Sequence, residues 1–87
     1  MLKVSGKTKP YYLSKAIINE LHKNGKKEAV EVRAIGADAV NRAVKAIILA
    51  RRFSVQEGFD LNIYPDFVEI NLGDQIVTVV TFMVLQN

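Results

Sequence analysis

Apolar residues recur along this chain with two different periods, which predict strands and helices in alternation. Alternating stretches at residues 2–5 and 28–35 indicate strands, because successive side chains of a strand point to opposite faces. Apolar positions at helical spacing predict helices over residues 10–24 and 37–52. Residues 54–58 are then expected to form a loop.

The last third of the chain predicts a β-hairpin. Residues 60–72 and 75–85 are rich in apolar and β-branched side chains, and Gly73-Asp74 between them is typical of a tight hairpin turn. The apolar positions of the first strand change parity near Pro65-Asp66, which predicts a bulge there. Pro65 also indicates an edge strand, because proline cannot donate a ladder hydrogen bond.

This βαβαββ order predicts one two-layer domain over residues 1–87, of the α/β (α+β) class. We expect a four-stranded mixed sheet in which the first three strands run parallel. Right-handed crossovers would place both helices on one face of the sheet. The other face stays open and carries Lys3, Glu31 and Arg33 on the first two strands.

The last strand is apolar on both sides, and a sheet covered on one face cannot bury both. One side carries Ile76, Val80, Phe82 and Val84, and the other carries Val77, Val79, Met83 and Leu85. We therefore expect this strand to help bury the subunit interface of a homo-oligomer, most simply a homodimer. The alternative is a small monomer that exposes several valines.

The charge distribution suggests an anionic partner. Residues 1–53 hold all twelve basic residues and four acids, a net charge of +8, whereas residues 54–87 hold five acids and no base. Such asymmetry suits an anionic partner, although a solvated charged surface would explain it too. The chain has no cysteine, no apolar leader and no run of about 18 apolar residues. We therefore expect a cytoplasmic protein that does not enter a membrane.

Motifs for enzyme chemistry are incomplete in this chain. Gly6-Lys7-Thr8 resembles the end of a nucleotide-binding P-loop, but the motif's first glycine is replaced by Met1. The turn at Gly36 has one glycine where a dinucleotide fingerprint needs three. The only histidine, His22, is expected to be a solvated or helix-end cation. We expect no catalysis, no metal and no cofactor.

Anion binding without catalysis fits the sequence better. The turns at residues 6–9 and 36–38 should emerge at the same end of the parallel strands, with both helix N-termini directed at one place. The first loop offers Lys7, Thr8 and Lys9, and a polar stripe of the second helix contains Asn41, Arg42 and Lys45. An ordinary solvated helix face, with Asp38 and Arg42 as an ion pair, is the alternative.

Two further rows on the second helix complete its predicted packing. Val40, Val44 and Ile47 are expected to face the core. A row of small residues could allow close packing against a neighbouring helix; it consists of Ala39, Ala43, Ala46 and Ala50.

The segments at residues 3–10 (KVSGKTKP) and 32–53 (VRAIGADAVNRAVKAIILARRF) resemble the stage V sporulation protein S family, over nearly the whole chain. The resemblance implies a fold similar to Alba, an archaeal chromatin and RNA-binding protein that dimerises. It also implies nucleic-acid binding at positions that match Lys7, Lys9, Asn41, Arg42 and Lys45. Alba grips DNA with a long basic hairpin arm, whereas the hairpin at residues 72–75 here is expected to be short and acidic.

The sequence therefore predicts a bacterial regulatory protein that binds nucleic acid, DNA or RNA, with little sequence readout. Lys7, Lys9, Arg42 and Lys45 would contact phosphates, with Thr8 and Asn41 as neutral donors and Arg33 as a further contact. The alternative is a non-catalytic interaction or oligomerisation module in developmental regulation. A small anionic ligand at the paired helix N-termini is a third possibility.

Overall fold

The computed structural model describes residues 1–87 and contains the six expected elements in the expected order. They are β1 (Leu2–Val4), α1 (Pro10–Asn24), β2 (Val30–Ala34), α2 (Ala37–Gln56), β3 (Leu61–Leu72) and β4 (Gln75–Gln86). The strands form one sheet in the order β1-β2-β4-β3. Strand β1 runs parallel to β2, and β4 runs antiparallel to both of its neighbours. The predicted mixed sheet and α+β class are confirmed.

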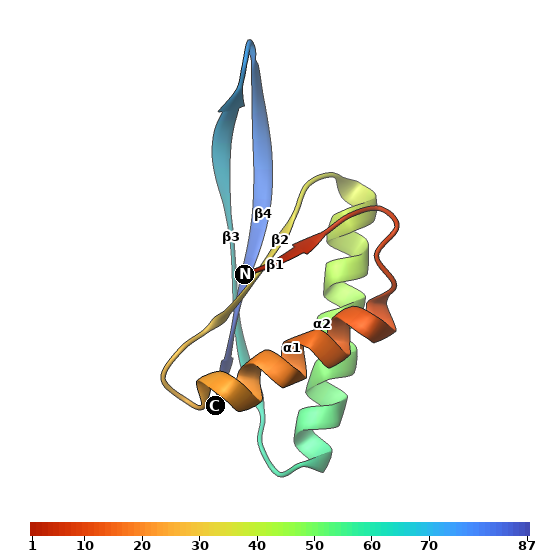
Figure 1. The fold of residues 1–87 in the computed structure, drawn as a ribbon, viewed down its shortest axis with the longest axis vertical. Helices are drawn as coiled ribbons and strands as arrows, with labels where there is room; N and C mark the ends of the chain where they lie inside the picture. The colour runs from red at the N-terminus through yellow and green to blue at the C-terminus, as the bar shows by residue number, and fades with distance from the viewer.

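Both helices pack on one face of this sheet (Figure 1). On β2, Val30, Val32 and Ala34 are buried beneath the helices, whereas Arg33 between them is exposed on the opposite face. This alternation follows from the pleat of a strand, which sends successive side chains to opposite sides. The core between the helices and the sheet also includes Ile17, Leu21, Leu61, Phe82 and Val84.

The side of α2 that enters the core differs from the prediction. The alanine row Ala39, Ala43, Ala46 and Ala50 is fully buried, while Val44 lies exposed on the outer side of the helix with Ile48. The small alanine side chains permit a close approach of α1, which crosses α2 in Figure 1. The assignment of Val44 to the core is therefore wrong, and α2 presents apolar side chains to solvent.

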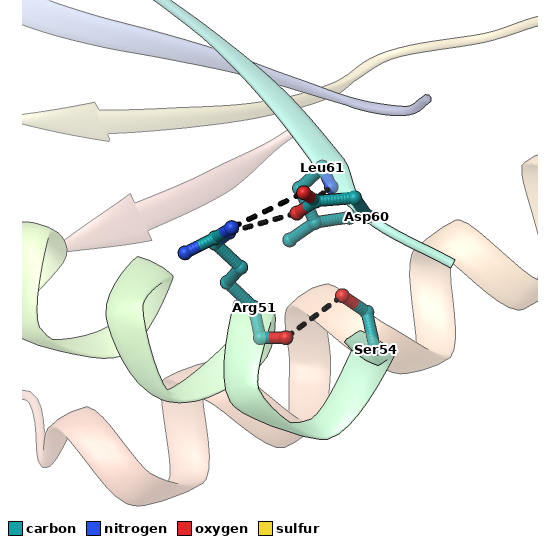
Figure 2. A network of polar contacts seen from close by, with 4 residues as sticks. All are labelled: Arg51, Ser54, Asp60 and Leu61. Carbon is teal, nitrogen blue, oxygen red and sulfur yellow. Dashed lines mark hydrogen bonds and ion pairs between the residues drawn. The ribbon is translucent and has the colours of Figure 1, made fainter. Parts of the chain in front are cut away.

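Helix α2 also continues one turn beyond its predicted end, so the expected loop at residues 54–58 is largely helical. Ser54 is buried, and its Oγ donates to the carbonyl oxygen of Arg51 at 2.9 Å. This bond satisfies the buried hydroxyl within the helix, so the serine does not end it. Arg51 then forms a two-point ion pair with Asp60 at the start of β3, at 2.8 and 3.1 Å (Figure 2).

The predicted bulge at Pro65-Asp66 is absent. The β3–β4 register runs without interruption from Leu61 opposite Gln86 to Leu72 opposite Gln75. The parity change therefore carries the apolar side chains from one face to the other: Ile63 faces the helices, and Ile70 faces the open side. Pro65 does lie on an edge strand, since β3 pairs with β4 alone.

The hairpin projects beyond the rest of the sheet (Figure 1). Strand β2 pairs with β4 only as far as Val80, which lies opposite Phe67, so the hairpin beyond this pair is two-stranded; we call residues 67–80 the arm. The connection at residues 72–75 is short, as expected, and each strand of the hairpin has 12 residues. The arm is acidic as expected, with Glu69 and Asp74 and no base.

Two contacts tie the far ends of the elements together. The Nε2 atom of Gln86 donates to the carbonyl oxygen of Leu21 at 2.9 Å, a second hydrogen bond to an acceptor near the end of α1 that also binds the Gly25 amide. The imidazole of His22 lies 2.7 Å from the Glu57 carboxylate, so this histidine bridges the C-terminal ends of the two helices. Neither helix is both long and apolar enough to cross a lipid bilayer.

Candidate nucleic-acid interface

The loop between β1 and α1 is held in shape by its own side chains. The Ser5 amide donates to Thr8 Oγ1 at 2.9 Å, and the Thr8 amide donates to the Ser5 carbonyl oxygen at 3.2 Å. The Lys7 amide donates to Ser5 Oγ at 3.1 Å. These bonds close a tight turn in which the side chains of Lys7 and Lys9 remain exposed. The sequence prediction treated Thr8 as a ligand donor, whereas here its hydroxyl first organises the loop.

Arg42 joins this loop to α2. Its Nη1 donates to the carbonyl oxygen of Thr8 at 2.9 Å, a contact that is partly buried. A Cβ built on Gly6 would lie 3.6 Å from that of Asp38, in ordinary van der Waals contact. The two strand-to-helix turns are therefore neighbours, as the parallel pairing of β1 and β2 predicted. No Asp38–Arg42 ion pair forms, because Arg42 turns to the loop instead.

Both helices begin at this end of the sheet without a side-chain cap. Lys9 occupies the N-cap of α1 and Gly36 that of α2, and neither provides a capping hydrogen bond. Gly36 has φ of 90°, a left-handed conformation that favours glycine over residues with a side chain. Uncapped N-termini leave backbone N–H groups available to an anion, although Asp38 places one negative charge in the first turn of α2.

The other predicted site residues on α2 lie beside Arg42, which is bonded to the loop. Asn41 and Lys45 are exposed and lie one turn apart, on the same side of the helix. Arg42 is half-buried between this side of α2 and the loop. One nitrogen of its guanidinium donates to the loop, and the rest of the group is free to contact a ligand. The structure thus brings together six predicted residues along one loop and one helix: Lys7, Thr8, Lys9, Asn41, Arg42 and Lys45.

Arg33 does not belong to this group. It pairs with Glu31 of the same strand and lies on the open face of the sheet, opposite Lys3 in the β1–β2 register. Both cations line a shallow hollow of about 320 Å³ with an apolar floor that includes Ile70 and Val79. A ligand on the loop and α2 would therefore have to reach around the sheet edge to contact Arg33.

An exposed aromatic cluster adjoins the basic loop, and the sequence prediction missed it. Tyr11 and Tyr12 occupy the first turn of α1, with ring centroids 5.7 Å apart in an edge-to-face arrangement. Tyr11 makes a second edge contact with Phe53 of α2 at 6.3 Å. Lysine ammonium groups lie over these rings: Lys9 over Tyr12 at 5.9 Å, and Lys15 over Phe53 at 4.3 Å. The consecutive tyrosines directly after Lys-Thr-Lys-Pro were the available signal.

The chemical groups at this surface are of a limited kind. No group of three or more His, Asp or Glu side chains lies together in a way that could hold a metal ion. The surface consists instead of exposed ammonium groups, a guanidinium, backbone N–H groups and phenol rings. Such groups can bind anions and flat aromatic ligands.

This architecture places the protein in the class of Alba-like α+β folds. The structure is similar to that of Alba from Thermoplasma volcanium, with a TM-score of 0.62 and 13% sequence identity over 97% of this chain and 96% of that chain. The family model for stage V sporulation protein S matches residues 1–87. The chain belongs to the stage V sporulation protein S family, which confirms the resemblance drawn from its sequence.

Proposed function

We propose that this protein is a non-catalytic bacterial regulator that binds nucleic acid, DNA or RNA, through its phosphates. The observation that carries the proposal is the loop of Lys7 and Lys9 fixed against α2 by the Arg42–Thr8 bond. A loop held in place loses little conformational freedom on binding, and its lysines already point outward. Membership of the stage V sporulation protein S family supports a regulatory role in sporulation.

The charge asymmetry supports phosphate contact on the loop and helix side. Lys7, Lys9, Arg42 and Lys45 would neutralise phosphates there, with Asn41 and Thr8 as neutral donors. Contacts of this kind position a protein on a nucleic acid and carry no direct sequence information, so we propose little sequence readout. The arm, which is acidic, would not grip the phosphate backbone.

Self-association in the cytoplasm forms part of the same proposal. Phe67 and Ile76 lie on the helix-side face of the arm and are 63% and 67% exposed. Val44 and Ile48 are exposed on the outer side of α2, which lies on the same side of the sheet. We propose that a second copy of this chain covers these apolar side chains, since single domains seldom expose so many large apolar residues on one side. A homodimer would also bring two basic surfaces to one nucleic acid.

A salt series tests nucleic-acid binding directly. Fluorescence anisotropy with duplex DNA, single-stranded DNA and RNA should give affinities that fall linearly with the logarithm of salt concentration. The slope on duplex DNA should be about −3 to −4, if the four cations each release about 0.9 counterion equivalents. Affinity that is insensitive to salt would contradict the proposal.

A protein-interaction module is the second candidate, and the exposed apolar arm is the observation that favours it. In that case the chain would self-associate or dock on a protein regulator, and the basic surface would only aid solubility. No binding to any nucleic acid at about 50 mM salt, where electrostatic contacts are strong, would support this candidate over the first.

A further inference from the structure

Two exposed tyrosines at the start of α1 make too few structural contacts to explain why both are present. Tyr11 is 52% exposed and Tyr12 is 66% exposed, whereas Leu13 and Ser14, the next residues, are buried. Neither phenol hydroxyl is hydrogen-bonded within the chain. Buried tyrosines usually find a partner for this hydroxyl, and exposed rings side by side leave a large apolar area in water.

The surroundings of these rings are cationic. Lys9 and Lys15 place ammonium groups over Tyr12 and Tyr11, at 5.9 and 5.4 Å from the ring centroids, and Lys7 lies in the adjoining loop. No acid forms an ion pair with any of these three lysines. The cluster therefore combines flat apolar rings with uncompensated positive charge, within one loop and the first two turns of one helix.

We propose that Tyr11 and Tyr12 form a stacking platform for unpaired bases, which makes single-stranded nucleic acid the preferred ligand class. This inference rests on the proposed function and specifies its ligand. Base rings stack on aromatic side chains only when they are free of a duplex stack, and every base offers a π-face, so such stacking requires no sequence motif. The neighbouring lysines would hold the phosphates on either side of a stacked base.

The geometry assigns different tasks to the two tyrosines. Tyr11 is braced by Phe53 on one edge and Tyr12 on another, so its ring is fixed in place. Tyr12 contacts only Tyr11 and the flexible side chain of Lys9 among the ring and cation partners, so a base can displace the lysine and stack. Tyr12 is therefore the better residue to substitute, because its removal leaves the α1–α2 contact through Phe53 intact.

The decisive comparison uses two oligonucleotides of about 12 residues, a length that suits one small single-strand site. One is oligo(dT), and the other is an abasic strand with the same phosphates and no bases. Wild-type protein should bind oligo(dT) about 5- to 100-fold more tightly than the abasic strand. Tyr12→Ala should lose most of that difference, Tyr12→Phe should keep it, and oligo(U) should behave as oligo(dT) does.

Tyr64→Ala is the matched control, since this tyrosine is 57% exposed but lies on the open face of the sheet. It should bind both strands as wild type does. The chain has no tryptophan and three tyrosines, so quenching of tyrosine fluorescence by oligo(dT) alone gives a second readout. Equal affinity for both strands, or equal losses in Tyr12→Ala and Tyr64→Ala, would overturn the platform. Salt-sensitive binding to both strands would still uphold the proposed function, and no binding to either strand would defeat it.

Discussion

Arg42 of α2 donates a hydrogen bond from Nη1 to the carbonyl oxygen of Thr8, 34 residues earlier in the chain, at 2.9 Å. The bond is partly buried and connects the loop after β1 to the helix after β2. A residue that the sequence suggests as a phosphate contact thus also positions two others, Lys7 and Lys9. Its loss should therefore have two consequences, one for folding stability and one for binding.

Arg42→Ala should lower the free energy of unfolding by about 1–2 kcal/mol, because a hydrogen bond from a charged donor is lost and the Thr8 carbonyl loses its partner. Lys45→Ala removes the same charge from an exposed position and should change it by less than about 0.5 kcal/mol. Urea denaturation at neutral pH measures both variants. Equal effects would show that the Arg42–Thr8 bond adds nothing to stability.

Reversing the charge of the loop should weaken nucleic-acid binding. The double variant Lys7→Glu/Lys9→Glu should lose about 10-fold or more in affinity, and the slope against salt should become shallower by about 2. The matched control is Lys26→Glu/Lys27→Glu, which makes the same charge change in an exposed turn before β2, at the opposite end of that strand. If the two double variants bind equally, net charge alone governs affinity and the loop has no special role.

The proposed homodimer predicts the mass of two chains in solution. Light scattering on wild-type protein at micromolar concentration should give about twice the chain mass of 9.7 kDa. Phe67→Glu/Ile76→Glu places charges on the helix-side face of the arm and should give the single-chain mass, because burying an unpaired charge is costly. Tyr64→Glu, at an exposed position on the open face of β3, should remain dimeric. A single-chain mass for wild type would refute the homodimer.

Acid stability should depend on the ion pair in Figure 2. The Arg51 guanidinium and the Leu61 amide donate hydrogen bonds to the Asp60 carboxylate and lower its pKa from 3.8 to about 2. Because the folded pKa is depressed, the stabilisation is complete above the unfolded pKa and is lost as pH falls from about 4 towards 2. The melting temperature of wild type should therefore fall more steeply over this interval than that of Asp60→Asn.

The control for the acid experiment is Asp74→Asn in the hairpin turn, where the carboxylate is exposed and has no ion-pair partner. This variant should keep the steep acid dependence of wild type. At neutral pH the Asp60→Asn variant should already be less stable than wild type. If the melting temperature of Asp60→Asn falls with pH as steeply as that of wild type, the exposed pair contributes nothing to stability, as is the case for many surface ion pairs.

Local sequence patterns explain how well the helices and strands were predicted. The limits of α1 were predicted to the residue, since proline fixes φ in its first turn and Gly25 past its end adopts the positive φ of 64° that few other residues tolerate. The error in α2 has an equally local cause. A helix with apolar residues around much of its circumference does not reveal which row its neighbour covers, and close contact with α1 favoured the alanines.

The site was predicted in part for a similar reason. Parallel strands bring their following turns to one sheet edge, so the meeting of the loop with α2 could be foreseen. The hydrogen bond from Arg42 to the loop, however, depends on how far the arginine side chain reaches across that edge. The sequence prediction also missed the tyrosine cluster. The arrangement of this cluster depends on the contact between Tyr11 and Phe53, which lie 42 positions apart in the chain.

The sequence by itself determined the order of elements, the tight turn at Gly73-Asp74, the family and the concentration of positive charge before residue 53. These features depend on neighbours in the chain and on composition. Only the tertiary structure decided that β4 lies between β2 and β3 and that the hairpin continues without a bulge into an arm. Strand order and register result from pairing between segments that lie far apart in the chain. In setting them, the burial of side chains beneath the helices outweighs the alternating pattern of a single strand.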